Sequence, residues 1–444
     1  MNLSFKGGIH PLSSIHHGKY LTEKAALEVM PAPKVLSFPI SQHIGAPAKP
    51  IVEVGDRVLM GQKIAEAAAF VSVPVHSSVS GTVTEIAQKS HILGRPVLSI
   101  VVENDFKDEK VPGFGETRDI SKLDKKELVG MIQEGGIVGM GGATFPTHVK
   151  LSPPDDKPID YLIVNAAECE PFLTADHRAL LEKTDDIVKG LQVVMKILGV
   201  QRGIIGIENN KKDAIAKVRT AVKGLPITVK TLRVKYPQGG EKQLIQAITK
   251  REVPSGGLPM DIGAVVLNTS TCIAIYQALV KQIPLIERIV TVTGIVKKPS
   301  NLIVRVGTSF EDVCEYVGGF TEHVEKLITG GPMMGIAQYS LDVSVIKGTS
   351  GILALGKELA VFPPQVNCIR CTRCVQACPA GLLPLTMNQH ILRADYETAE
   401  KYHVMDCIEC GACSYICPSN RYLTQSFKLG KMQILKQRKA QSAK

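Results

Sequence analysis

The strongest constraint on how this chain folds is a cysteine pattern that occurs twice near the C-terminus. In each copy two residues separate the first three cysteines from one another, three residues separate the third from a fourth, and a proline follows. The first cysteine run consists of Cys368, Cys371, Cys374, Cys378 and Pro379, and the second consists of Cys407, Cys410, Cys413, Cys417 and Pro418. Eight of the eleven cysteines lie in these runs. This spacing is typical of proteins that bind two [4Fe–4S] clusters.

The pattern predicts crossed ligand sets, because in such proteins the fourth cysteine of each run binds the cluster of the other run. We expect a first cluster bound by Cys368, Cys371, Cys374 and Cys417, and a second cluster bound by Cys407, Cys410, Cys413 and Cys378. Such clusters carry single electrons, so the chain is predicted to belong to an electron-transfer path. Structural zinc normally uses four ligands in two pairs, which explains neither the close spacing of three cysteines, nor the position of the fourth, nor the following proline. A disulfide framework is disfavoured because no secretory leader is evident.

Length and composition indicate a globular protein of several domains. The 444 residues exceed one ordinary domain, and 44% of them are hydrophobic. No segment is predicted to span a membrane: the uncharged stretch 262–280 has the length, but polar residues interrupt it, so we expect a strand, a turn and the start of a helix there. We therefore expect the protein to face the cytoplasm.

The positive charge is concentrated towards the C-terminus. The formal net charge is +10, and from Lys357 onward twelve Lys and Arg face six Asp and Glu, with no acid after Arg421. A basic, mildly amphipathic end favours an anionic membrane surface or an acidic partner, and a solvated, frayed tail is the equal alternative. We expect no nucleic-acid partner.

The N-terminal part reads as short strands. Between residues 50 and 103, apolar residues alternate with polar ones and are broken by Gly-Asp and Ser-Gly turns, which favours a small β-sandwich or barrel. The pattern resembles the barrel-sandwich hybrid of lipoyl and biotinyl domains. The apparent hairpin turn at 76–79 has no lysine to carry a modification. We therefore expect a structural module.

The middle of the chain alternates strands and helices, which predicts an α/β domain with a largely parallel sheet. Strands are expected at 161–164 and 203–207, and helices at 178–198 and 211–223. The segment 289–319 resembles the small SLBB (β-grasp-like) domain. The stretch 382–405, between the cysteine runs, is largely helical in pattern after Pro384.

Glycine-rich and acidic motifs in the middle domain point to a flavin. Glycines at such density allow backbone amides to approach a ligand closely, although this signal alone is weak. The motifs are Gly139-x-Gly141-Gly142-Ala143-x-Phe145-Pro146-Thr147, Asn165-Ala-Ala-Glu168-Cys-Glu170-Pro171 and Tyr236-Pro-Gln-Gly239-Gly240-Glu241. Together they resemble the FMN- and NADH-binding subunit of respiratory complex I. With the cysteine runs, the SLBB-like segment and the opening Phe5-Lys-Gly-Gly-Ile-His-Pro11, the chain most closely resembles the RnfC family, whose members are subunits of the Rnf ion-translocating oxidoreductase complex.

This resemblance implies four domains in a multidomain α/β and β fold. They are an N-terminal barrel-sandwich-like module (1–118), an FMN- and NADH-binding α/β domain (119–287), an SLBB-like domain (288–358) and a ferredoxin-type, α-helical domain with two [4Fe–4S] clusters and a basic tail (359–444). The residues implied for non-covalent FMN binding are Gly139, Gly141, Gly142, Lys150, Asn165, Glu168, Gly239, Gly240, Glu241 and Asn268. Those implied for NADH are Phe145, Glu168 and Glu170. No catalytic side chain is implied, because FMN carries the hydride.

At two positions this sequence differs from the complex I relatives, and three cysteines have no counterpart role. The complex I relatives have an arginine where Met140 stands and an acid where Ala167 stands, so contacts made by those side chains are absent here. We assign no role to Cys169, Cys272 or Cys314.

The resemblance implies an NAD-linked oxidoreductase subunit that exchanges hydride with NAD(H) and single electrons through its clusters. It would lie on the cytoplasmic side of the bacterial membrane, bound peripherally through membrane-embedded and ferredoxin-type subunits of the complex. The alternatives are an electron-relay scaffold without a working flavin site and a cobalamin-reductase-like flavoprotein. The sequence does not specify the coupling ion or the direction of electron flow.

Overall fold

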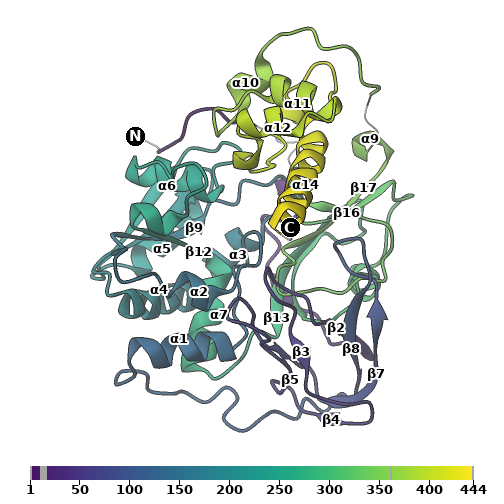
Figure 1. Cartoon of the computed structure of the whole chain (residues 1–444). Coiled ribbons are helices and arrows are strands. Elements are labelled where there is room, and N and C mark those ends of the chain that lie inside the picture. The colour runs from purple at the N-terminus through teal and green to yellow at the C-terminus, as the bar shows by residue number, and fades with distance from the viewer. Residues whose placement is uncertain (1–2, 11–17, 361–362, 443–444) are drawn as a thin grey trace.

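The structure, a computed structural model, describes residues 3–10, 18–360 and 363–442. Pro11 of the N-terminal motif lies outside these ranges. Figure 1 shows an α/β domain on one side, two β-rich parts on the other, and a helical cluster domain above them. The predicted multidomain α/β and β fold is confirmed.

The α/β domain is built on a parallel four-stranded sheet in the order β11-β10-β9-β12. Its strands are β9 (Tyr161–Ala166), β10 (Gly203–Glu208), β11 (Ile227–Leu232) and β12 (Ala264–Asn268). Its helices are α1 (Lys125–Glu134), α2 (Thr147–Lys150), α3 (Ala175–Glu182), α4 (Thr184–Leu198), α5 (Lys212–Ala221), α6 (Glu241–Thr249) and α7 (Thr269–Val280), with the 3₁₀ turn η2 (Pro259–Ile262).

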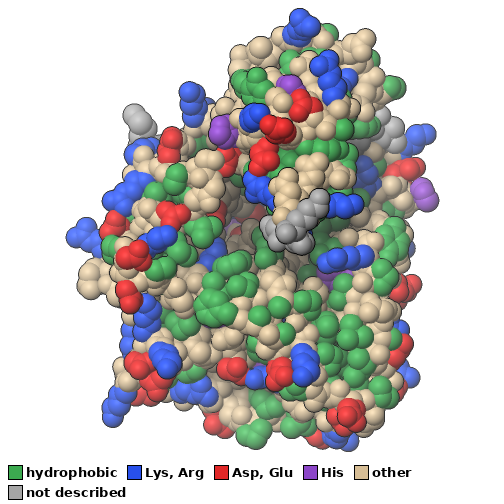
Figure 2. All heavy atoms as spheres, viewed as in Figure 1, with side chains coloured by type: hydrophobic (Ala, Val, Ile, Leu, Met, Phe, Trp, Pro, Cys, Tyr) green, Lys and Arg blue, Asp and Glu red, His purple; other side chains and the backbone are tan. Residues whose placement is uncertain are grey.

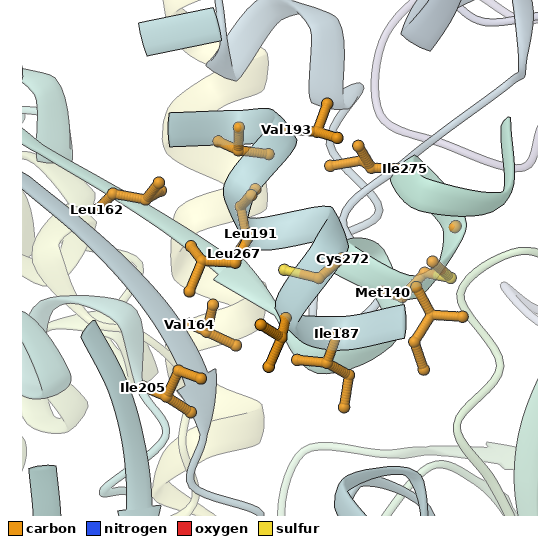
Figure 3. Close-up of a cluster of buried hydrophobic side chains, with 14 of the residues drawn as sticks. Met140, Leu162, Val164, Ile187, Leu191, Val193, Ile205, Leu267, Cys272 and Ile275 are labelled. Carbon is orange, nitrogen blue, oxygen red and sulfur yellow. The ribbon is translucent and has the colours of Figure 1, made fainter. Parts of the chain in front are cut away.

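The core of this domain lies between the sheet and α4 with α7. Figure 3 shows Leu162 and Val164 of β9 facing Ile187 and Leu191 of α4, with Cys272 of α7 among them. These residues are almost fully buried. Strand residues are apolar in near-continuous runs because helices cover a parallel sheet on both faces.

The N-terminal module packs a four-stranded antiparallel sheet against a three-stranded one, in the orders β2-β8-β7-β4 and β3-β5-β6. The strands are β2 (Val35–Pro39), β3 (Lys49–Pro50), β4 (Arg57–Val58), β5 (Lys63–Glu66), β6 (Val75–His76), β7 (Gly81–Lys89) and β8 (Val97–Asn104). The chain enters this module after η1 (Lys19–Leu21) and β1 (Leu27–Val29).

The SLBB-like part forms a six-stranded mixed sheet in the order β1-β14-β13-β17-β15-β16. Its elements are β13 (Glu287–Gly294), β14 (Ser300–Arg305), α8 (Phe310–Tyr316), β15 (Lys326–Thr329), β16 (Ile336–Gln338) and β17 (Gly351–Leu355). Strand β1 pairs with β14 in parallel, so residues 27–29 contribute an edge strand to a sheet whose other strands lie far along the chain.

The cluster domain is a set of short helices closed by one long helix. They are α9 (Lys357–Ala360), α10 (Arg373–Ala377), α11 (Pro384–Leu392), α12 (Tyr396–Lys401), η3 (Val404–Asp406), α13 (Ala412–Tyr415) and α14 (Leu423–Ser442). Phe427 and Ile434 of α14 are 1% exposed and pack in the domain core. The basic C-terminal stretch is therefore helical up to Ser442 and docked as far as Ile434, so the expectation of a frayed tail is wrong, although residues 435–441 are exposed to solvent.

The helices and strands also test the expectations for residues 178–198 and 262–280. The single helix expected at 178–198 is two helices, α3 and α4, because the backbone of Lys183 leaves the helical region and Thr184 and two aspartates begin a new first turn. The stretch 262–280 forms β12 and α7, as expected. No helix in the described part of the chain combines the length and the apolar character that crossing a bilayer requires.

Candidate functional site

The eight thiols of the cysteine runs line two separate hollows in the cluster domain. Cys368, Cys371, Cys374 and Cys417 line the first hollow. Cys378, Cys407, Cys410 and Cys413 line the second hollow. Each hollow thus combines three cysteines of one run with the last cysteine of the other. Within the described ranges, no three His, Cys, Asp or Glu side chains are placed to hold a single metal ion, so the thiols surround a space instead of a point.

The two hollows differ in their exposure to solvent. Cys368 and Cys371 of the first hollow are exposed, whereas Cys410 and Cys413 of the second are buried. Burial raises the pKa of both Cys410 and Cys413 to about 12. Thiols in such a place ionise only with a strong positive partner, which iron bound by the thiolates supplies.

Backbone amides point at sulfurs in both hollows. The amides of Leu382 and Glu409 donate to Sγ of Cys378 and Cys407 over 3.3 and 3.4 Å. The amide of Arg370 donates to Sγ of Cys368 over 3.4 Å. Hydrogen bonds to the sulfurs stabilise a negatively charged cluster and so tune its potential. The donor set and its hydrogen bonds fit [4Fe–4S] clusters.

The candidate flavin site lies at the carboxyl edge of the parallel sheet. From β9 the chain continues to β10 and β11 on one side, whereas β12 lies on the other side of β9. Open α/β sheets bind ligands at such a switch point. Asn165 is the last residue of β9 that pairs with β12, and it is in register with Asn268 at the end of β12. In Figure 2 the surface is hollowed between the α/β domain and the cluster domain.

Loops around this edge bring most of the predicted flavin residues together. The Asn165 amide donates to the carbonyl of Gly239 over 2.8 Å. Lys150, the last residue of α2, forms an ion pair with Glu241 at the start of α6, with 2.8 Å between Nζ and Oε1. The Asn268 side chain caps α7 by accepting from the Ser270 amide.

The glycines of the two motifs serve different purposes. A Cβ on Gly141 would lie 2.9 Å from Cβ of Asn268, and one on Gly239 would lie 2.4 Å from the carbonyl oxygen of Ala167. Gly240 caps α6, and a Cβ there would lie 2.5 Å from the Gln243 side chain. These three are required by packing within the chain. A Cβ on exposed Gly142 would meet no atom within 4 Å, so that position is open to a ligand.

Three further predicted residues, Gly139, Phe145 and Glu168, form hydrogen bonds away from the carboxyl edge of the sheet. Gly139 and Phe145 hold the ends of the glycine loop together through a 2.8 Å backbone hydrogen bond. Phe145 is partly exposed. Glu168 caps the start of α3: its Oε1 accepts from the Asp176 amide over 2.7 Å. Its burial raises its pKa.

Glu170 points away from Glu168, towards the SLBB-like part. Its carboxylate accepts from the backbone amides of Met333 and Met334 over 3.1 and 2.9 Å. Burial raises its pKa to about 7. The two acids predicted to meet one dinucleotide thus face different elements, because Glu168 is held by the nearby start of α3 and Glu170 by backbone amides of the SLBB-like part.

Comparison with known proteins places these parts in one family. Family models match the RnfC barrel sandwich hybrid domain at 3–107, the Nuo51 FMN-binding domain at 132–277, the SLBB domain at 289–337 and the 4Fe-4S dicluster domain at 363–418. A subunit of the proton-translocating ferredoxin:NAD(+) oxidoreductase complex of Clostridium ljungdahlii is 48% identical, covering 91% of this chain and 88% of its own. Its counterpart in the Na(+)-translocating complex of Acetobacterium woodii is 45% identical, covering 98% of each.

The chain belongs to the RnfC family. A third relative, from the ion-translocating oxidoreductase complex of Rhodobacter capsulatus, is 40% identical and covers 97% of this chain and 83% of its own length. The matches confirm the predicted family, the order of its parts, and FMN with two [4Fe–4S] clusters as cofactors.

In this member of the RnfC family, a buried arginine lies beside Met140 of the glycine loop. Arg288 of β13 is 3% exposed, and its guanidinium contacts the sulfur of Met140 and donates to the carbonyl of Thr349. Burial lowers its pKa to about 10. No local motif signals this residue, because β13 follows the flavin motifs in another domain.

Sequence reasoning also missed two polar residues around the site. Asp176, in the first turn of α3, accepts from the side-chain amide of Asn268 over 2.9 Å. The ammonium of Lys19 donates to the carbonyl of Glu168 over 2.8 Å. An acid in a first helical turn is a recognisable signal for Asp176. Lys19 has none, because it is about 150 residues away in sequence.

The three cysteines outside the runs are ordinary thiols. Cys272 and Cys314 are buried in two hydrophobic cores, and burial raises the pKa of each to about 12. Cys169 accepts a hydrogen bond from the Gly239 amide over 3.3 Å, and burial raises its pKa too. None has the depressed pKa of a reactive cysteine.

Proposed function

We propose that this chain is the peripheral FMN and iron–sulfur subunit of a membrane complex that couples ferredoxin and NAD chemistry to ion transport. The activity proposed for the complex is the one in the names of the relatives, which are subunits of ion-translocating ferredoxin:NAD(+) oxidoreductase complexes. The observation that supports this chain's part in it is the arrangement of eight thiols. The second hollow adjoins the flavin-type domain, and the first hollow opens to solvent.

FMN would be bound at the carboxyl edge of the α/β sheet. The open backbone at Gly142 supports contact with the cofactor, and Lys150 supplies a positive charge that Glu241 orients. The full proposed set is Gly139, Gly141, Gly142, Lys150, Asn165, Glu168, Gly239, Gly240, Glu241 and Asn268. Bound FMN exchanges a hydride with nicotinamide and single electrons with clusters.

NADH would approach from the open side of the glycine loop. The partly exposed ring of Phe145 is available for stacking on an adenine, and Glu168 and Glu170 would accept hydrogen bonds from dinucleotide hydroxyls. Both carboxylates already accept internal hydrogen bonds, so only their remaining lone pairs are free for a ligand. The side chains position two rings and perform no acid or base chemistry.

The clusters would be bound by the crossed sets, the first by Cys368, Cys371, Cys374 and Cys417 and the second by Cys378, Cys407, Cys410 and Cys413. The second cluster, buried and next to the flavin-type domain, would exchange electrons with FMN. The first cluster, at the surface, would exchange them with a partner. This order follows from burial, because an exposed cluster is accessible to an external carrier.

The subunit would lie on the cytoplasmic side of the membrane and bind there through other subunits of the complex, membrane-embedded and ferredoxin-type. Its relatives include proton-translocating and Na(+)-translocating complexes, so family membership does not specify the coupling ion.

Reconstitution tests the proposal. Iron-reconstituted protein should contain about eight irons and retain added FMN after desalting, and NADH should bleach the flavin band. Iron without FMN would indicate an electron-relay scaffold. Flavin that NADH reduces, with cobalamin as the preferred acceptor, would favour the cobalamin-reductase-like alternative.

A further inference from the structure

Tyr236 lies between the flavin-type domain and the second hollow. It opens the third flavin motif but is assigned no role there. It is 1% exposed, and its hydroxyl oxygen is 2.7 Å from the carbonyl oxygen of Cys410. On the other side the same hydroxyl is 3.4 Å from Oε1 of Glu170. One phenol thus touches both a cysteine of the second hollow and an acid of the flavin-type domain.

The N-terminal segment, residues 7–9, fixes the position of this tyrosine. The backbone of Tyr236 exchanges two 2.8 Å hydrogen bonds with the backbone of Ile9. The amide of Gly8 donates to the carbonyl of Ala377, and a Cβ on Gly7 would lie 2.5 Å from the carbonyl oxygen of Cys378. The phenol is therefore held by a segment that is itself packed against the second hollow.

The direction of the hydroxyl hydrogen follows from the chemistry of its partners. The Cys410 carbonyl oxygen only accepts, so the 2.7 Å contact requires Tyr236 to donate. Glu170 is oriented independently by the amides of Met333 and Met334. The O–H dipole therefore points its positive end at the cysteine loop.

We propose that Tyr236 is a positioning residue that raises the reduction potential of the second cluster, an inference that rests on the proposed function of the chain. A donor aimed at the carbonyl of a cluster ligand stabilises the added negative charge of the reduced cluster. Because the phenol is fixed by the flavin-type domain and by the N-terminal segment, the hydrogen bond also holds the Cys410 loop at a constant distance from that domain.

The test is Tyr236→Phe, which removes one oxygen and keeps the ring. In iron-reconstituted protein with FMN, EPR-monitored redox titration should show a lower midpoint potential for the second cluster and an unchanged one for the first. Iron, sulfide and FMN contents are measured on the same samples. If the unmodified protein itself contains no clusters or no FMN, the proposed function is contradicted. If Tyr236→Phe contains as much iron, sulfide and FMN as the unmodified protein and its potentials are unchanged, only the role of Tyr236 is overturned.

Two control variants separate the hydroxyl from general packing. Tyr422→Phe alters an exposed phenol of the cluster domain and should leave both potentials unchanged. Ile9→Ala loosens the same buried cluster of side chains without removing the hydroxyl. If Ile9→Ala reproduces the shift of Tyr236→Phe, packing alone explains it and the proposal is wrong.

A second substitution decides the question if Tyr236→Phe fails to retain the cluster. Replacing Tyr236 with 2,3-difluorotyrosine keeps the shape and makes the hydroxyl a stronger donor. The second cluster should then have a higher midpoint potential than in the unmodified protein. An unchanged or lower potential would overturn the proposal.

Discussion

Replacing Gly142 with valine should weaken the binding of FMN and leave both clusters in place. Gly142 is exposed, its φ lies outside the left-handed region, and a Cβ there would meet no atom within 4 Å. The chain itself therefore tolerates a side chain at this position. A bound cofactor would not, because the valine would occupy the space beside the glycine loop.

The expected magnitudes are separable. A surface substitution without such clashes changes the free energy of unfolding by about 0.5 kcal/mol or less. Forcing extra methyl groups into a packed contact costs about 1–3 kcal/mol. At about 1.4 kcal/mol per tenfold change in Kd, FMN should bind roughly 5- to 140-fold more weakly. Fluorescence titration of FMN gives the Kd, and thermal unfolding gives the stability.

Two matched glycines serve as controls. Gly130 in α1 also faces open space, so Gly130→Val should keep FMN. Gly239→Val should lower the unfolding temperature, because its Cβ would lie 2.4 Å from the carbonyl oxygen of Ala167. Unchanged FMN affinity in Gly142→Val would show that the glycine loop is only a turn, and the proposed contact between this loop and FMN would be refuted.

Three further predictions concern the clusters and pH. Cys378→Ser should change the EPR spectrum of the second cluster; a change confined to the first cluster would refute the crossed ligand sets. Removing the residues after Lys428 should unfold the cluster domain, measured as lost iron, because Ile434 is 1% exposed and losing such a side chain costs about 2–5 kcal/mol. Burial raises the pKa of Glu170 from 4.5 to about 7, so the folded state holds this proton more tightly than the unfolded state does. Relative to Glu170→Gln, the free energy of unfolding should therefore fall by about 3 kcal/mol between pH 4.5 and 7, and denaturant titrations with equal slopes for the two proteins would contradict this.

The grouping of the thiols could be predicted from sequence because ligand spacing is a local property. Cysteines separated by two residues can face the same space, and the fourth cysteine, which is followed by proline, binds the cluster of the other run. The exposure of Cys368 and the burial of Cys410 could not be predicted, because the flavin-type domain and the N-terminal segment cover only one hollow. The parallel sheet could be predicted because strands and helices alternate along this part of the chain.

The orientation of the acids and the state of the C-terminal stretch required the structure. Glu170 is turned by amides of Met333 and Met334, more than 160 residues away. Lys431 donates to the Cys407 carbonyl over 3.0 Å and pairs with Glu409, which converts a basic tail into a docked helix. Such long-range partners leave no periodic signal in a sequence.

The central claim is that electrons pass between the clusters and NAD(H) through FMN in this chain. The most direct measurement is anaerobic formation of NADH from NAD⁺ and reduced methyl viologen, a one-electron donor, in protein with FMN and both clusters. The same measurement is made on protein lacking FMN and on protein lacking the clusters. We predict NADH formation only when both cofactors are present. Equal rates without the clusters, or no NADH from the complete protein, would contradict the account.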